Sequence, residues 1–108
     1  MVKKDHRSDI TIVGAGMVGS AAALSLARAG FNITLIEANE IPQWSAEEYY
    51  LRVSAISLAS EQLLEDIGVW QQIKNRRVSS YEHMRVWDAS GTGRLEFDAA
   101  ESGVAYLG

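Results

Sequence analysis

Cysteine is absent from the 108 residues of the sequence, and this absence removes several classes of site. Without a thiol there is no disulfide framework, no thiolate zinc site and no cysteine nucleophile. Histidine is almost as scarce, because the chain holds only His6 and His83, far apart in the sequence. A metal site built on imidazole ligands is therefore not expected.

Basic residues and proline are also few. Ten lysines and arginines stand against fourteen acidic residues, a formal net charge of −4. Because nucleic-acid binding needs a basic face, no nucleic acid partner is expected. Pro42 is the single proline, and the length of 108 residues allows one small domain.

A charge-free run of eighteen residues starts at Ile10, after the basic opening MVKKDHRSD, and ends before Arg28. It has three candidate meanings: a secretory signal, a membrane span, or the start of a nucleotide-binding fold. A signal peptide begins with a positively charged region, and the acidic residues Asp5 and Asp9 do not fit such a region. A membrane span needs about 20 apolar residues, and glycines interrupt this shorter run. No transmembrane segment is therefore predicted.

The expected secondary structure favours the nucleotide-binding interpretation. Residues 10–13 are a β-rich apolar run, typical of a strand buried in a parallel sheet. Residues 20–29 are rich in Ala and Leu and predict a helix, which Gly30 ends in a left-handed cap. Residues 31–36 are a second β-rich run. This order predicts an α/β fold that begins with a Rossmann-like parallel βαβ unit.

The turn between the first strand and the helix has the glycine spacing G-x-G-x-x-G. In dinucleotide-binding proteins the first glycine permits the tight turn, the second lets the backbone approach a pyrophosphate, and the third lets the helix pack closely. The phosphates lie at the helix N-terminus, where free N–H groups and the dipole favour negative charge. The residues predicted to line this site are Gly14, Ala15, Gly16, Met17, Val18 and Gly19.

Glu37 follows the second predicted strand, eighteen residues after the last glycine of the motif. A carboxylate at this place accepts hydrogen bonds from the ribose hydroxyls of a dinucleotide. It also repels a 2′-phosphate, which argues against NADP. The glycine spacing alone is a weak signal, so the prediction rests on its combination with the strands, the helix and the acid. A glycine-rich turn in an unrelated α/β protein is the alternative.

The rest of the chain carries signals of structure rather than of chemistry. Residues 38–52 predict a loop, and a helix is expected from about Leu58 to Ile67, with a further turn containing Trp70 and Ile73. Leu63, Leu64 and Ile67 would lie on one buried face of that helix. Segments 82–88 and 94–98 predict two strands joined by a hairpin turn. Their acids Asp88, Glu96 and Asp98 are expected to be solvated rather than to form an acid–base pair.

Three segments of the chain resemble a known family: IVGAGMVGSAAALSLARAGFNITLIE, LRVSAISLASEQLLEDIGVW and RRVSSYEHMRVWDASGTGRLEFDAAESGVAYLG. Together they are similar to the N-terminal part of the FAD-dependent hydroxylases of ubiquinone biosynthesis, and most similar to the 2-octaprenylphenol hydroxylase (VisC-like) branch. These enzymes are group A flavoprotein monooxygenases with the fold of para-hydroxybenzoate hydroxylase. The second segment is more specific than the glycine motif.

The resemblance implies FAD rather than NAD as the cofactor. It places the three motif glycines on the FAD pyrophosphate, Glu37 on the adenosine ribose, and Arg52 near the flavin and its phosphates. It implies an enzyme that uses reduced flavin and O2 to hydroxylate a polyprenyl phenol, with its catalytic residues unassigned. It also implies a cytoplasmic protein, with peripheral association at the inner membrane or with a ubiquinone-pathway complex as an alternative.

Family members are several times longer than this chain. The resemblance therefore implies an N-terminal tail over residues 1–8, the first part of a FAD-binding domain over 9–80, and a hairpin region leading into the substrate domain over 81–108. Residues 1–108 alone are not expected to be active. The alternatives are a fragment of an NAD-dependent dehydrogenase and a truncated product without independent activity.

Overall fold

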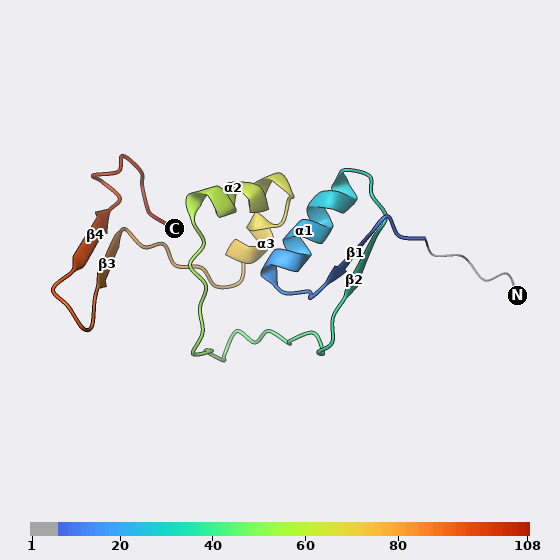
Figure 1. The fold of residues 1–108 in the computed structure, drawn as a ribbon, viewed down its shortest axis with the longest axis horizontal. Helices are drawn as coiled ribbons and strands as arrows, with labels where there is room; N and C mark the ends of the chain where they lie inside the picture. The colour runs from blue at the N-terminus through green and yellow to red at the C-terminus, as the bar shows by residue number, and fades with distance from the viewer. Residues whose placement is uncertain (1–6) are drawn as a thin grey trace, which may run out of the picture. The chain divides into compact units, whose positions relative to one another are not determined.

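The computed structural model describes residues 7–108, which divide into two compact units, Met1–Ser45 and Ala46–Gly108. The first unit holds a parallel pair of strands, and the second holds two helices and an antiparallel pair (Figure 1). Residues 1–6, including His6 and most of the expected tail, lie outside the described residues. The domain boundaries at residues 8 and 80 stay a prediction.

The first unit is the βαβ unit that the sequence predicts. Strand β1 (Ile10–Val13) leads into helix α1 (Met17–Arg28), which is followed by strand β2 (Ile33–Ile36). The two strands are parallel, with Ile10 opposite Ile33 at one end of the pair and Val13 opposite Ile36 at the other. Helix α1 packs against both strands, as Figure 1 shows.

Helix α1 begins at Met17, three residues earlier than expected, because Gly16 already serves as its N-cap with an extended backbone. The helix ends as predicted at Gly30, whose φ of +98° is a left-handed conformation that glycine adopts without strain. The Gly30 N–H donates to the Ala27 carbonyl, and the Phe31 N–H donates to the Leu26 carbonyl. Since Phe31 is part of this helix ending, β2 starts only at Ile33.

The contact between α1 and the end of β1 leaves no room for a side chain. A Cβ built on Gly19 would lie 1.9 Å from the Gly14 carbonyl oxygen and 3.6 Å from Ile12 Cγ2. A Cβ on Gly16 would meet nothing within 4 Å. The third glycine of the motif is therefore required by the protein's own packing, whereas the space beside the second is open.

The second unit packs its helices around a small core. Helix α2 (Leu58–Asp66) has Ser57 as its predicted N-cap, whose hydroxyl accepts a hydrogen bond from the Ser60 N–H at 3.3 Å. Helix α3 (Trp70–Lys74) packs against α2. Ile67 and Trp70 are both buried, while Leu63 is 47% exposed. The prediction that Leu63 lies in the core is wrong, because a short helix with one small neighbour buries only a narrow stripe.

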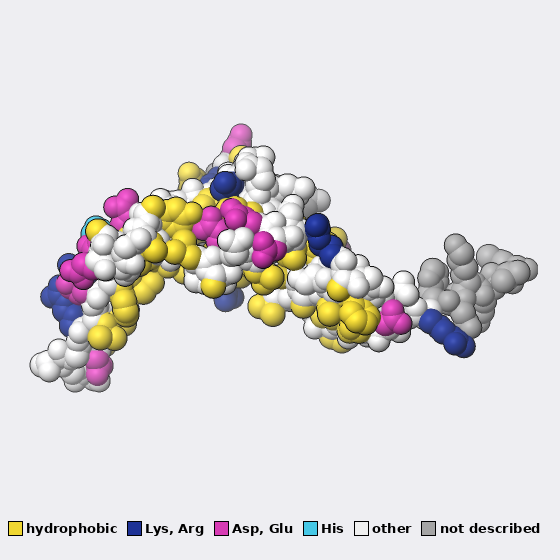
Figure 2. Space-filling model, turned by 90° about the horizontal axis from the view of Figure 1, so that it is seen from above, with side chains coloured by type: hydrophobic (Ala, Val, Ile, Leu, Met, Phe, Trp, Pro, Cys, Tyr) yellow, Lys and Arg dark blue, Asp and Glu magenta, His cyan; other side chains and the backbone are white. Residues whose placement is uncertain are grey.

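Strands β3 (His83–Trp87) and β4 (Arg94–Asp98) form the predicted antiparallel hairpin. Since side chains alternate along a strand, the hairpin has a polar face and an apolar face. Figure 2 shows the hydrophobic side chains gathered along the hairpin, beside its charged side chains. The exposed apolar residues of the strands on that second face are Met84, Val86, Leu95 and Phe97.

These elements make a mixed α/β protein whose first unit is consistent with a Rossmann-like FAD-binding fragment. Within residues 7–108, no helix has the length and apolar character that crossing a bilayer requires.

The close approach at Gly19 predicts a destabilised Gly19→Ala variant. Its Cβ would overlap the Gly14 carbonyl, so α1 must move away from the strand, at a cost of about 1–3 kcal/mol. Hydrogen exchange of the α1 amides measures this cost. Gly16→Ser is the matched control, because its side chain enters open space and serine caps helices well, and it should change stability by less than about 0.5 kcal/mol. Equal exchange in Gly19→Ala and the wild type would contradict the prediction.

Candidate functional site

The glycine loop between β1 and α1 is held by three hydrogen bonds from different parts of the first unit. The Gly14 N–H donates to the Ile36 carbonyl at 2.7 Å, which ties the loop to the end of β2. The Ser20 hydroxyl donates to the Ala15 carbonyl at 2.9 Å. The Ala15 N–H donates to Glu37 Oε2 at 2.8 Å. The structure thus brings the predicted loop and the predicted acid into direct contact.

The Glu37 carboxylate is bonded on both of its oxygens. Oε1 accepts the backbone N–H of Asn39 at 2.9 Å and its side-chain Nδ2 at 3.0 Å, while Oε2 accepts the Ala15 N–H. These donors stabilise the charged form and lower the pKa of Glu37 below its ordinary value of 4.5. The Asn39 backbone contributes most, followed by the Ala15 backbone and the Asn39 side chain. Glu37 is therefore a fixed anion at the carboxyl end of β2.

The N-terminus of α1 is suited to a bound anion. Its N-cap, Gly16, offers no side-chain hydrogen bond, and the first turn contains no acidic residue. The first N–H groups of a helix have no partner within the helix and carry its positive dipole end. Because the space beside Gly16 is open, a pyrophosphate can approach this backbone. The loop and Glu37 together fit the adenosine diphosphate half of FAD.

The other predicted site residues differ in their surroundings. Met17 and Val18 are exposed in the first turn of α1, where their backbone N–H groups are available to an anion. Arg52 belongs to the second unit and lies exposed in a segment before α2 that forms neither helix nor strand. Its place near the flavin remains a prediction. The structure brings together the glycine loop and Glu37.

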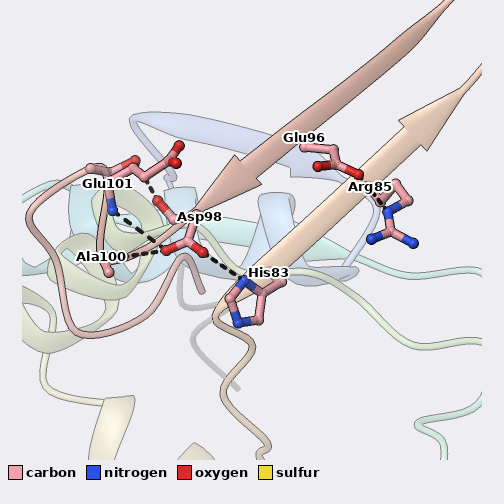
Figure 3. Close-up of polar contacts among 7 residues, drawn as sticks. His83, Arg85, Glu96, Asp98, Ala100 and Glu101 are labelled. Atoms are coloured by element: carbon pink, nitrogen blue, oxygen red, sulfur yellow. Dashed lines mark hydrogen bonds and ion pairs between the residues drawn. The ribbon is translucent and has the colours of Figure 1, made fainter.

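The three acids of the hairpin are occupied locally and do not converge. Asp98 Oδ2 lies 2.9 Å from His83 Nδ1, and its Oδ1 accepts the Ala100 N–H at 2.7 Å (Figure 3). Glu96 pairs with Arg85 at 2.8 Å and with Arg94. These arginines, Arg94 above all, hold the pKa of Glu96 below its usual range.

The third acid, Asp88, accepts hydrogen bonds from the backbone and side chain of Ser90 at the hairpin turn, which lower its pKa. Asp88 and Glu96 are exposed, as expected, while Asp98 is half-buried, and all three are bonded to groups of the hairpin or the turn after it. They form no acid–base pair.

Ser20 and Asn39 escaped the sequence analysis. Ser20 directly follows the last glycine of the motif, and its hydroxyl donates to the Ala15 carbonyl. Asn39 lies in the loop after β2, and its side-chain amide donates to Glu37. An asparagine two residues after the acid is the signal that could have been used, because Asn readily bonds to nearby backbone and side-chain groups.

Part of the chain matches a known protein family, and most of it is similar to known enzymes. Residues 9–48 match the family described as FAD dependent oxidoreductase (DAO). The chain is 42% identical over 102 residues to the 3-demethoxyubiquinol 3-hydroxylase of Escherichia coli (strain K12), covering 94% of this chain and 26% of that protein. It is also 42% identical over 96 residues to the mitochondrial ubiquinone biosynthesis monooxygenase COQ6 of Danio rerio, covering 83% of this chain and 20% of that protein.

The resemblance to the ubiquinone-biosynthesis hydroxylases is confirmed. The matched DAO family is FAD dependent, so the prediction of FAD rather than NAD as the cofactor is confirmed as well. The similarity supports an oxidoreductase. The chain spans about a quarter of the E. coli relative and a fifth of the zebrafish one.

A third relative shows that the similarity reaches beyond ubiquinone enzymes. The chain is 35% identical over 97 residues to the tRNA 5-methylaminomethyl-2-thiouridine biosynthesis bifunctional protein MnmC of Pseudomonas putida (strain KT2440), covering 84% of this chain and 14% of that protein. What these proteins share over this stretch is therefore not a common substrate.

The lowered pKa of Glu37 predicts a pH-dependent contribution to stability. Because the pKa in the folded state is below the unfolded value, the stabilisation is present above about pH 4.5 and is lost as the pH falls through the lowered pKa. The difference in free energy of unfolding between the wild type and Glu37→Gln should therefore shrink between about pH 6 and about pH 3. Urea titrations measure it. Glu40→Gln is the control for removal of one charge, and a difference independent of pH would contradict the prediction.

Proposed function

We propose that this chain supplies the part of a flavin-dependent aromatic-ring monooxygenase that binds the adenosine half of FAD. The observation that carries the proposal is the fixed Glu37 carboxylate beside the glycine loop, 2.8 Å from the Ala15 N–H. A ribose placed on this carboxylate would direct the attached pyrophosphate toward the open backbone at Gly16 and the N-terminus of α1.

Each residue of the site has a binding or orienting role in this proposal. Gly16 gives the pyrophosphate access to the backbone, and the N–H groups of Met17 and Val18 face its negative charge. Glu37 accepts a ribose hydroxyl and disfavours a 2′-phosphate. Arg52 is assigned to the flavin side of the cofactor by resemblance alone. When bound, FAD supplies the redox chemistry of hydroxylation, and the protein supplies position and polarity.

The substrate we propose is a polyprenyl phenol of ubiquinone biosynthesis, hydroxylated with O2, in an enzyme with the para-hydroxybenzoate hydroxylase fold. The support is the similarity of the chain to the E. coli 3-demethoxyubiquinol 3-hydroxylase and the zebrafish ubiquinone biosynthesis monooxygenase. The sequence resemblance to the 2-octaprenylphenol hydroxylase branch points the same way. A polyprenyl tail would bring such an enzyme to the inner membrane surface, so we propose a cytoplasmic protein with peripheral association there.

FAD binding tests the adenosine site. Gly16→Val should abolish it, because a branched side chain fills the space that the pyrophosphate needs, yet should leave the fold intact, since a Cβ there meets no protein atom within 4 Å. Glu37→Ala should weaken FAD about tenfold by removing charge-assisted hydrogen bonds to the ribose. Calorimetric titration of FAD measures both, with circular dichroism as the control for folding. A folded Gly16→Val variant with wild-type affinity would place the cofactor elsewhere.

Residues 1–108 taken alone are expected to bind FAD weakly and not to hydroxylate a phenol. The described site contacts the adenosine half of the cofactor, whereas hydroxylation needs a dry, enclosed surrounding for the flavin ring and the substrate. Product formation from a phenolic quinone precursor, with reductant, FAD and O2, measures this, with the full-length E. coli relative as positive control. Hydroxylation at a rate near that of the relative would contradict the expectation.

A further inference from the structure

The Glu37 carboxylate is oriented mainly by one neighbouring residue. A carboxylate has about four lone-pair sites on its two oxygens. Asn39 fills two of them, both on Oε1, through its backbone N–H at 2.9 Å and its Nδ2 at 3.0 Å. Ala15 fills one on Oε2 at 2.8 Å. Oε2 is therefore the oxygen that lies against the glycine loop.

The two donors of Asn39 fix the plane of the Glu37 carboxylate. An exposed carboxylate turns readily about its last torsion, which is broad and roughly two-fold. Two donors from one residue on the same oxygen hold that torsion, because rotation would break both bonds together. With Oε1 held, Oε2 stays against the Ala15 N–H, and the acceptor is fixed before any ligand arrives.

We propose that Asn39 is a positioning residue for adenosine recognition, which fixes the Glu37 carboxylate so that Oε2 accepts a ribose hydroxyl beside the glycine loop. The proposal rests on the proposed FAD site and adds to it a residue that touches the acid rather than the cofactor. Preorganisation of this kind strengthens binding by removing the cost of ordering the acid when the ligand binds.

Two substitutions separate the amide from the rest of the residue. Asn39→Ala keeps the backbone N–H and removes Nδ2, so Oε1 loses one of its two donors. Asn39→Asp keeps the shape of the side chain but sets a second carboxylate against Glu37, which raises the pKa of Glu37 by repulsion. Asn32→Ala is the matched control in the same unit, because Asn32 is exposed and its backbone makes the hydrogen bonds to Asp9 and Ile10.

ADP, the adenosine half of FAD, is the probe, with calorimetric titration of the whole protein from about pH 4 to about pH 8. Asn39→Ala should weaken ADP about three- to tenfold, and Asn39→Asp should weaken it further. Asn32→Ala should bind ADP like the wild type. ADP affinity should fall at low pH, where Glu37 becomes protonated. Since the Asn39 amide helps to lower the pKa of Glu37, this fall should occur at a higher pH in Asn39→Ala. Asn39→Ser, which keeps a short donor, should recover part of the affinity.

The outcomes distinguish this proposal from the function on which it rests. Wild-type ADP affinity and an unshifted fall at low pH in Asn39→Ala, together with weakened binding in Glu37→Ala, would overturn the role of Asn39 alone. Wild-type ADP affinity in Glu37→Ala, or no ADP binding by the wild type, would overturn the adenosine site and the role of Asn39 with it. A loss in Asn39→Ala that is matched by Asn32→Ala would reduce the effect to general destabilisation and overturn the positioning role.

Discussion

The contact between the third glycine of the loop and the backbone of the first determines the geometry of the whole first unit. Because nothing larger than a hydrogen fits between Gly19 and the Gly14 carbonyl, α1 starts directly above the end of β1. The first N–H groups of the helix therefore lie at the edge of the sheet where β2 ends and Glu37 follows. The N-terminal end of α1 and the Glu37 carboxylate meet because Gly19 has no side chain.

The site places a helix N-terminus, which attracts anions, close to a carboxylate, which repels them. The helix terminus attracts an anion, and the nearest ionised side chain is itself an anion held by neutral donors, Ala15 and Asn39. A ligand suited to both must carry negative charge at one point and hydroxyl donors at a neighbouring point, as the ribose and pyrophosphate of a dinucleotide do. A simple phosphate would satisfy the helix and be repelled by the acid.

Local patterns predicted most of the secondary structure, because caps and strand periodicity act over a few residues. The ends of α1 and α2 at glycine and the Ser57 cap follow from backbone conformation and short-range hydrogen bonds alone. The exposure of Leu63 could not be predicted, since it depends on how much of α2 a neighbour covers.

Within the site, Glu37 was found because a recurrent fold places an acid there. Asn39 and Ser20 were missed, because their roles depend on which atom happens to lie within reach after folding. The family resemblance supplied the cofactor and the proposed substrate class, which neither composition nor spacing could give.

The parts of the proposed adenosine site lie between residues 10 and 39, so they are close along the chain as well as in space. Structures dominated by such local contacts close only short loops and assemble quickly. The parts proposed to hold the cofactor can therefore come together before the rest of the chain is ordered, and a ligand that binds only the folded state would favour their ordered form.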